Sequence, residues 1–199
     1  MKLRRISNSP LLDPSICALV LIAPDTHEQA SIDPSTRAIY RRTVPTVIKA
    51  AEIASVPVFV LSHPIQQEKQ SPSPTEPATP SHRRFVFEDH TSPWAHKAFV
   101  EALAAEDRSI LILAGFWLEH EILATALHAL VDSYDVYVLL DATPPRSRRA
   151  FEPARERLNQ AGAIPVIASQ VVNEWSIEAE DAPTRSALVS LLPPLINAG

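Results

Sequence analysis

Glycine is scarce in this chain: among 199 residues it occurs only at Gly115, Gly162 and Gly199. A dinucleotide-binding fingerprint needs three glycines in one turn and a phosphate-binding P-loop needs two, so both motifs are excluded. Cysteine is scarcer still, because Cys17 is the single example and no disulfide can form within the chain. One thiol fits a reducing compartment, and we therefore expect a cytoplasmic protein.

An excess of basic residues is also missing. The chain has 18 Lys and Arg against 23 Asp and Glu, which gives a formal net charge of −5. Nucleic-acid binders normally present a basic stripe, so we expect no nucleic-acid partner and no docking on an anionic membrane. No apolar run approaches the roughly 18–20 residues that span a bilayer. The N-terminal segment also lacks the apolar stretch of a signal peptide.

The chain does contain several short apolar runs, separated by segments with helical periodicity. Continuous apolar runs of this length indicate strands that are buried on both faces. In the helical segments, apolar residues recur on one face, most clearly at 119–133. We predict strands at 17–22, 56–61, 84–87, 109–114, 135–140 and 164–167. We predict helices at 33–55, 94–105, 119–133, 147–161 and along the C-terminal segment up to Pro193 and Pro194.

Two prolines bear on these helices. Pro45 lies inside the 33–55 helix, where the missing backbone N–H predicts a kink or a split. Pro153 lies inside the 147–161 helix and fits a first turn better than an interior, which leaves the start of that helix open. Gly162 is the expected C-cap of the same helix.

Strands that alternate with helices form βαβ units and predict a parallel sheet covered on both faces. Residues 66–82 are rich in Pro, Ser and Thr and have no periodicity. Because similar elements resume on both sides, we interpret 66–82 as a mobile loop within a single domain of residues 1–199. Ligands bind such sheets at the carboxyl ends of the strands. A site is therefore expected among 23–25, 62–63, 115–121 and 141–143.

Taken in order, these segments resemble the isochorismatase-like cysteine hydrolases, and in particular the YcaC-type branch. The resemblance covers about residues 15–190. It rests on the segment Cys17–Glu28, the glycine after the 109–114 strand, the Tyr-Asp-Val-Tyr-Val strand that leads to Asp141, and the helix exit Arg157-x-x-x-Ala161-Gly162-Ala163. The resemblance implies an α/β fold, namely a three-layer α/β/α sandwich with a parallel, Rossmann-like sheet of order 3-2-1-4-5-6. It also implies a homo-oligomer without a cofactor, and a non-proline cis peptide bond within the turn 115–118.

In the family that the chain resembles, an Asp, a basic residue and a Cys form the catalytic triad. The Asp belongs at the end of the first strand, where this chain has Ala23, and Asp25 stands where glutamine is usual. The Cys belongs in the turn after the third strong strand, where this chain has Glu121. The basic residue falls near Arg83 or Arg84. The family-equivalent positions are therefore Ala23, Arg84 and Glu121, and no residue of the triad is expected to be intact apart from the arginine.

A glutamate cannot perform the chemistry of the missing thiolate. At the start of a helix Glu121 would be stabilised as an anion, which makes it a weaker base and a weaker nucleophile. Its attack on an amide would give an anhydride, from which loss of the amine is unfavourable. Cys17 cannot take over, because it opens the first strand and Ala23 ends it, roughly 20 Å away. We interpret Cys17 as a buried structural thiol.

The candidate pocket residues at the sheet edge are Asp25, His63, Arg84, Trp117, His120 and Glu121. Several also have an ordinary structural explanation: Asp25 as a turn residue, His63 as a surface residue and Glu121 as a first-turn charge. Adjacent helical positions diverge by about 100°, so His120 is not expected to act together with Glu121. No compact ligand spacing links His27, His63, His82, His90 and His96, so no metal site is predicted.

Three functions remain open at this point. The first is a catalytically degenerate family member that binds a small molecule or assembles with itself. The second is a hydrolase in which Asp25, Glu121 and Arg84 act as acid, base and anion clamp on a small acidic or amide substrate. Carboxylates about 4–8 Å apart around an open cavity would favour it, whereas an aromatic ring filling the pocket would count against it. The third is an interaction protein that uses the 66–82 loop or the proline-rich tail.

Overall fold

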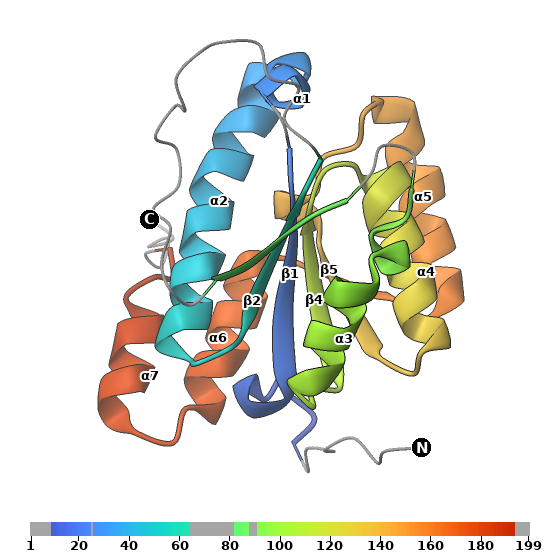
Figure 1. Ribbon diagram of the computed structural model, residues 1–199. Coiled ribbons are helices and arrows are strands. Elements are labelled where there is room, and N and C mark those ends of the chain that lie inside the picture. Colours follow the sequence, from blue (N-terminus) through green and yellow to red (C-terminus); the bar gives the residue numbers. More distant parts are fainter. Residues whose placement is uncertain (1–8, 25, 64–81, 88–90, 194–199) are drawn as a thin grey trace, which may run out of the picture.

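The computed structural model describes residues 9–24, 26–63, 82–87 and 91–193 (Figure 1). Within these ranges a six-stranded sheet has the order β3-β2-β1-β4-β5-β6, and its neighbouring strands pair in parallel. The strands are β1 (Cys17–Ala23), β2 (Val58–Ser62), β3 (His82–Val86), β4 (Ile110–Gly115), β5 (Asp135–Leu139) and β6 (Ile164–Val166). The strand order and the three-layer architecture expected from the sequence are confirmed.

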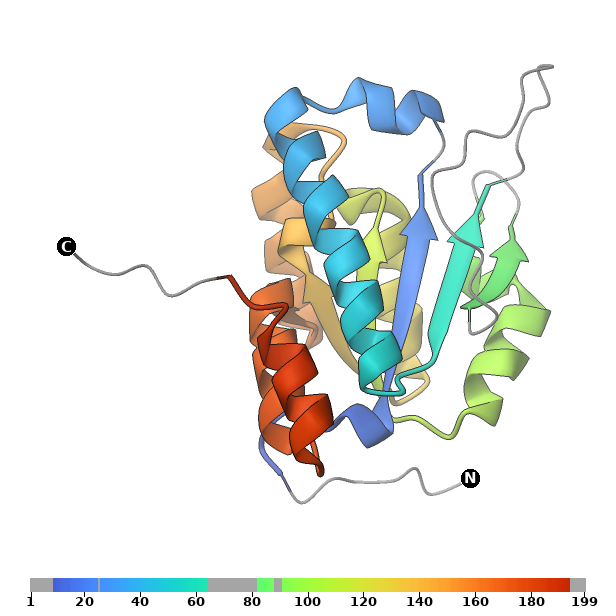
Figure 2. The same ribbon diagram turned by 90° about the vertical axis from the view of Figure 1, so that its left-hand side faces the viewer.

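Helices cover both faces of the sheet (Figures 1 and 2). One face carries α2 (Pro34–Ile53), α6 (Ala168–Glu178) and α7 (Ala182–Val189), and the other carries α3 (Lys97–Ala105), α4 (Leu123–Val131) and α5 (Arg148–Ala161). The short helix α1 (Thr26–Ser31) crosses above the carboxyl end of β1 (Figure 2). Four single turns complete the list: η1 (Pro14–Ile16), η2 (Pro93–Ala95), η3 (Leu118–Ile122) and η4 (Leu140–Ala142).

The sheet divides the apolar core into two clusters, because successive side chains of a strand point to opposite faces. On β1, Leu19 and Leu21 pack with α2 and α6, whereas Val20 and Ile22 pack with α3 and α4. The six residues from Cys17 to Ile22 are at most 1% exposed. Burial on both faces therefore explains why the first strand reads as a continuous apolar run.

The helix predictions need three corrections. Helix α2 is not split, because Pro45 lies on its exposed face, where solvent can hydrogen-bond the carbonyl group that loses its partner. The predicted 94–105 helix consists of the 3₁₀ turn η2 followed by α3, which His96 caps by accepting a hydrogen bond from the Phe99 N–H. The predicted 119–133 helix begins with the π-helical turn η3, and α4 proper starts only at Leu123.

Other boundaries also differ from the sequence predictions. Helix α1 was not predicted, and the C-terminal helical segment is two helices, since Asp181 caps a new start at α7. Helix α5 starts at Arg148 and includes Pro153 in its interior. The predicted 66–82 loop lies outside the described residues, except for His82, which opens β3.

Gly115 marks the point where β4 turns away next to β1. Its backbone has a φ of +117°, and a Cβ atom there would lie 2.0 Å from the carbonyl oxygen of Ile22. The N–H of Phe116 donates to that same oxygen at 3.1 Å. This close approach of two main chains requires a residue without a side chain.

We predict that Gly115→Ala lowers the free energy of unfolding by about 3 kcal/mol or more, because its methyl group would collide with main-chain atoms. Gly162→Ala is the matched control, since Gly162 also has a positive φ (+99°) but no neighbour within 4 Å of an added Cβ. Gly162→Ala should lower the free energy of unfolding by about 1 kcal/mol. Urea unfolding followed by circular dichroism measures both, and equal costs would contradict the proposed role of the close contact.

Candidate functional site

The carboxyl ends of the central strands meet around the turn that follows Gly115. Ala23 at the end of β1 pairs with Ser62 at the end of β2, and Ile22 pairs with Gly115. His63 continues directly from β2. In parallel α/β sheets this edge is where ligands bind, which makes it the candidate site.

Two aromatic rings of the turn are buried below this edge. The peptide bond between Phe116 and Trp117 is cis, as the resemblance implied. Phe116 is 1% exposed and Trp117 is 4% exposed, and their ring centroids lie 4.6 Å apart. Phe116 also meets the ring of Tyr40 edge-on at 4.9 Å. The space beside the turn is thus filled by aromatic side chains on the α2 side of the sheet.

Glu121 is held in place by groups from two different elements. It lies in the π-helical turn η3, and its Oε2 accepts a hydrogen bond from the backbone N–H of Trp117 at 3.1 Å. Its Oε1 lies 3.9 Å from Nε2 of His63, and the two side chains are 19% and 15% exposed, respectively. That separation is longer than a hydrogen bond but allows a charge interaction when the imidazole is protonated.

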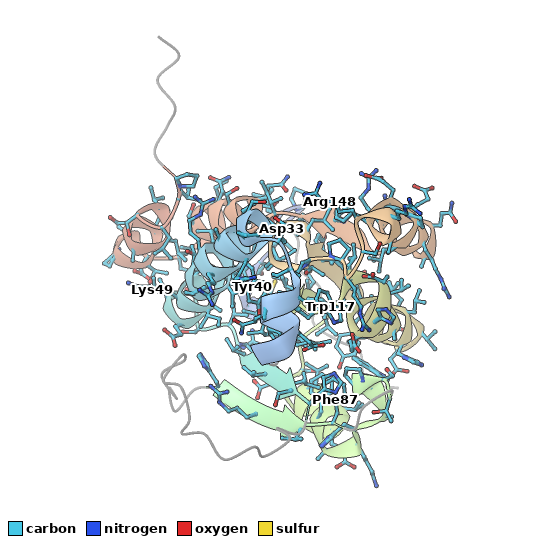
Figure 3. The ribbon with its side chains drawn as sticks, turned by 90° about the horizontal axis from the view of Figure 1, so that it is seen from above. Asp33, Tyr40, Lys49, Phe87, Trp117 and Arg148 are labelled. Atoms are coloured by element: carbon cyan, nitrogen blue, oxygen red, sulfur yellow. The ribbon has the colours of Figure 1, made fainter. Side chains whose placement is uncertain are left out.

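A second carboxylate reaches Trp117 from α1. Glu28 Oε1 accepts a hydrogen bond from the indole Nε1 at 2.9 Å. Figure 3, which looks onto the carboxyl ends of the strands, shows Trp117 beside α1. The far end of α1 is tied to α2, because Arg37 donates to the carbonyl oxygens of Ala30 and Ile32 at 3.1 and 2.9 Å. The sequence reasoning missed Glu28, although its position just after the first strand was an available signal.

Phe87 takes the position next to His63 at the end of β3. Its ring centroid lies 4.3 Å from that of the imidazole, and its N–H donates to the carbonyl oxygen of Ser62 at 3.1 Å. Phe87 is 3% exposed and belongs to the core on the α3 side. Sequence reasoning missed it, because a phenylalanine in an apolar run is indistinguishable from an ordinary core residue.

Arg83 and Arg84, near which the family's basic residue falls, lie within β3. Arg83 forms an ion pair with Glu106 and donates to the carbonyl oxygen of Ala102 at 3.3 Å, on the α3 side. Arg84 is exposed, pairs with Val60 within the strand, and by alternation faces the α2 side. The structure thus places Arg84 on the opposite face of the sheet from His63 and Phe87.

Ala23 is half-buried and packs against the core on the α2 side. His120 is exposed, whereas the neighbouring Glu121 is largely buried, in keeping with the expected divergence of adjacent helical positions. Asp25 lies outside the described residues, so its distance from Glu121 stays open. The functional roles of all these residues remain predictions.

Two further carboxylates at this edge cap helices. Glu119 accepts hydrogen bonds from the backbone N–H groups of Arg146 at 3.0 Å and Ser147 at 3.2 Å, at the start of α5. Asp141, after β5, accepts from the N–H of Ala168 at 3.1 Å, at the start of α6. Burial raises the pKa of Asp141, and the hydrogen bond from Ala168 partly offsets this effect. These two carboxylates position α5 and α6 relative to the sheet edge.

Within the described ranges, no group of three or more His, Cys, Asp or Glu side chains is arranged to hold a metal ion. Of the histidines considered from the sequence, His82 lies 3.2 Å from Glu52 and His96 caps α3, while His90 lies outside the described residues. None of the helices in the described part of the chain is both long enough and apolar enough to cross a bilayer.

Comparisons with known proteins agree with this architecture. Residues 30–171 match the isochorismatase domain. Over 95 residues the chain is 30% identical to the probable hydrolase YcaC of Escherichia coli K12. That match spans 46% of this chain and 46% of YcaC, so it covers about half the length of this curated relative.

Solved structures extend the similarity over nearly the whole chain at the level of the fold. The YcaC gene product of Escherichia coli, described as an octameric hydrolase of unknown specificity, aligns with a TM-score of 0.74 at 21% identity, covering 94% of this chain and 92% of that one. YcaC from Pseudomonas aeruginosa, solved with hexane-2,5-diol and covalent acrylamide, aligns with a TM-score of 0.74 at 18% identity over 94% and 93%. The MAR1 ribonuclease of Caenorhabditis elegans aligns with a TM-score of 0.69 at 21% identity over 95% and 94%.

The family match covers more than half of the chain, and the sheet order and helical layers fit it. This chain therefore belongs to the isochorismatase family and has YcaC-type proteins among its relatives.

Proposed function

We propose that this protein is a catalytically degenerate member of the isochorismatase family, which binds a small molecule at the turn after β4 without hydrolysing it through a thiol. The observation that carries this proposal is the position of the only cysteine. Cys17 is completely buried and pairs with Ile110 at the start of β1, whereas the candidate site lies beyond Ala23 at the other end of that strand. Burial raises the pKa of its thiol to about 12, so no thiolate is available at neutral pH.

The residues at the family-equivalent positions support the same proposal. Glu121 replaces the expected nucleophile, and its carboxylate is bonded to the Trp117 amide. Ala23 replaces the expected aspartate, and a methyl group cannot accept a proton from a nucleophile. Of the two residues near which the family's basic residue falls, Arg83 is paired with Glu106 on the α3 side and Arg84 faces the α2 side of the sheet. The nucleophile and the general base that thiol-based hydrolysis uses are thus both replaced at their family-equivalent positions.

A second candidate function is a hydrolase that works with a carboxylate. The observation in its favour is the 3.9 Å approach of Glu121 to His63, a pair that could act as general acid and base on a small acidic or amide substrate. The trio of Asp25, Glu121 and Arg84 is not what favours it, because Arg84 faces the opposite side of the sheet. The buried rings of the turn count against it, since they occupy space that a substrate would need.

We predict that a thiol reagent leaves native Cys17 unlabelled at neutral pH and labels one thiol per chain once the protein is unfolded in urea. The physical reason is that the sulfur is both inaccessible and protonated. Glu121→Cys in a Cys17→Ala background is the matched control, because it places one thiol at the sheet edge and should react without denaturant. Rapid labelling of native Cys17 would contradict the proposed absence of thiol chemistry.

We predict that the purified protein does not hydrolyse amide or enol-ether substrates faster than its Glu121→Gln variant does. Glu121→Gln keeps the shape of the side chain but removes its charge. Product formation followed by chromatography is the measurement. If the protein does turn over such a substrate, and Glu121→Gln or His63→Gln abolishes that activity, the proposal is wrong and the second candidate function is established. The double variant Ala23→Asp with Glu121→Cys asks in addition whether the pocket still recognises a hydrolase substrate once a thiol and its base are restored.

We also propose that the protein assembles with itself. Its structural relative from Escherichia coli is described as octameric. Some large apolar side chains of this chain are exposed, among them Val131 at 81% and Val86 at 56%, and burying them would favour association. Light scattering coupled to gel filtration should therefore give a mass that is a multiple of 21.9 kDa. A mass equal to that of one chain, at all concentrations tested, would contradict self-assembly.

A further inference from the structure

Two nitrogen atoms from different elements converge on the carboxylate of Glu121. The backbone N–H of Trp117, in the turn after β4, points at Oε2 from 3.1 Å. Nε2 of His63, after β2, lies 3.9 Å from Oε1. Each carboxylate oxygen therefore faces one nitrogen, and both side chains are more than four-fifths buried. An amide and an imidazole that face one carboxylate at a ligand-binding sheet edge form the recognition geometry of a small anion.

The second N–H group of the same tryptophan is also taken by a protein carboxylate. The indole Nε1 of Trp117 donates to Glu28 at 2.9 Å. Arg83 of β3 is paired with Glu106 on the α3 side, and Arg84 lies two residues before the end of β3, the edge strand that β2 and β1 separate from β4. An anionic ligand that approached Trp117 would thus meet two carboxylates in place of free donors, and like charges repel it.

We propose that Glu121 is a tethered anion that occupies an anion site of its own protein. Its carboxylate fills the position between the Trp117 amide and His63 where a carboxylate group of a ligand would otherwise bind. The native site consequently accepts neutral or cationic small molecules and excludes carboxylates. This assignment of ligand charge rests on the ligand-binding role proposed above, and it makes Glu121 a specificity-determining residue.

The test removes the tethered carboxylate and offers a free one. In Glu121→Ala no carboxylate lies between the Trp117 amide and the His63 imidazole, and the deleted side chain leaves space. Formate or acetate, added as the sodium salt, should therefore bind there. Binding to the folded state raises the unfolding temperature, and a saturable increase of about 2–4 °C over equal sodium chloride is the expected result. The wild-type protein should show no increase beyond the chloride control.

Three variants isolate the cause. Glu121→Gln should not respond to formate, because its side-chain oxygen still accepts from the Trp117 N–H and fills the space. Glu101→Ala removes a carboxylate from the exposed surface of α3, where Glu101 is 66% exposed and pairs with Lys97, and should also show no response. Glu121→Ala combined with His63→Ala should respond less than Glu121→Ala alone, because one of the two nitrogen atoms is gone.

The proposal is overturned if folded Glu121→Ala responds to formate no more than Glu101→Ala does, or if the wild-type protein responds equally. If Glu121→Ala does not fold, Glu121→Ser, which also removes the carboxylate and leaves space, takes its place with the same two outcomes. Failure of formate binding leaves the proposed function standing. Conversely, substrate turnover by the wild-type protein would overturn the proposed function whatever formate does to the variant.

Discussion

The contact between Gly115 and the main chain of Ile22 is the constraint on which the candidate site depends. The absence of a Cβ lets β4 turn away directly beside β1, and the N–H of Phe116 then closes onto the Ile22 carbonyl oxygen. From that fixed point the chain places Trp117 in the core and Glu121 at the edge of the sheet. A side chain at position 115 would displace the whole turn, and every polar contact of the site with it.

Four carboxylates described at this edge of the sheet accept hydrogen bonds from N–H groups. Glu121 accepts from the amide of Trp117, and Glu28 accepts from the indole of the same residue. Glu119 and Asp141 cap the starts of α5 and α6. The fold is that of the isochorismatase family, and the described carboxylates at this edge are held by N–H groups.

The differences between the sequence predictions and the structure have separate physical causes. Pro45 leaves α2 unbroken because it faces solvent. The helix after Gly115 was predicted as regular, yet it starts with a π-helical turn in which Glu121 reaches back to its own helix start. Arg84, near which the family's basic residue falls, faces the α2 side of the sheet, whereas Phe87 packs against His63 on the other side.

The sequence by itself determined the α/β class and, through its resemblance to a known family, the order of the strands in the sheet. Apolar runs buried on both faces, with helical periodicity between them, are local patterns that predict alternating strands and helices. The expected carboxyl ends of the parallel strands, with one glycine after a strand, pointed to the candidate edge at 115–121. The sequence also showed that the single cysteine opens the first strand, far from that edge. Only the tertiary structure decided which side chains meet there. His63, Phe87 and Glu121 come from three separate elements, and the register and twist of the sheet, which no local pattern encodes, bring them together.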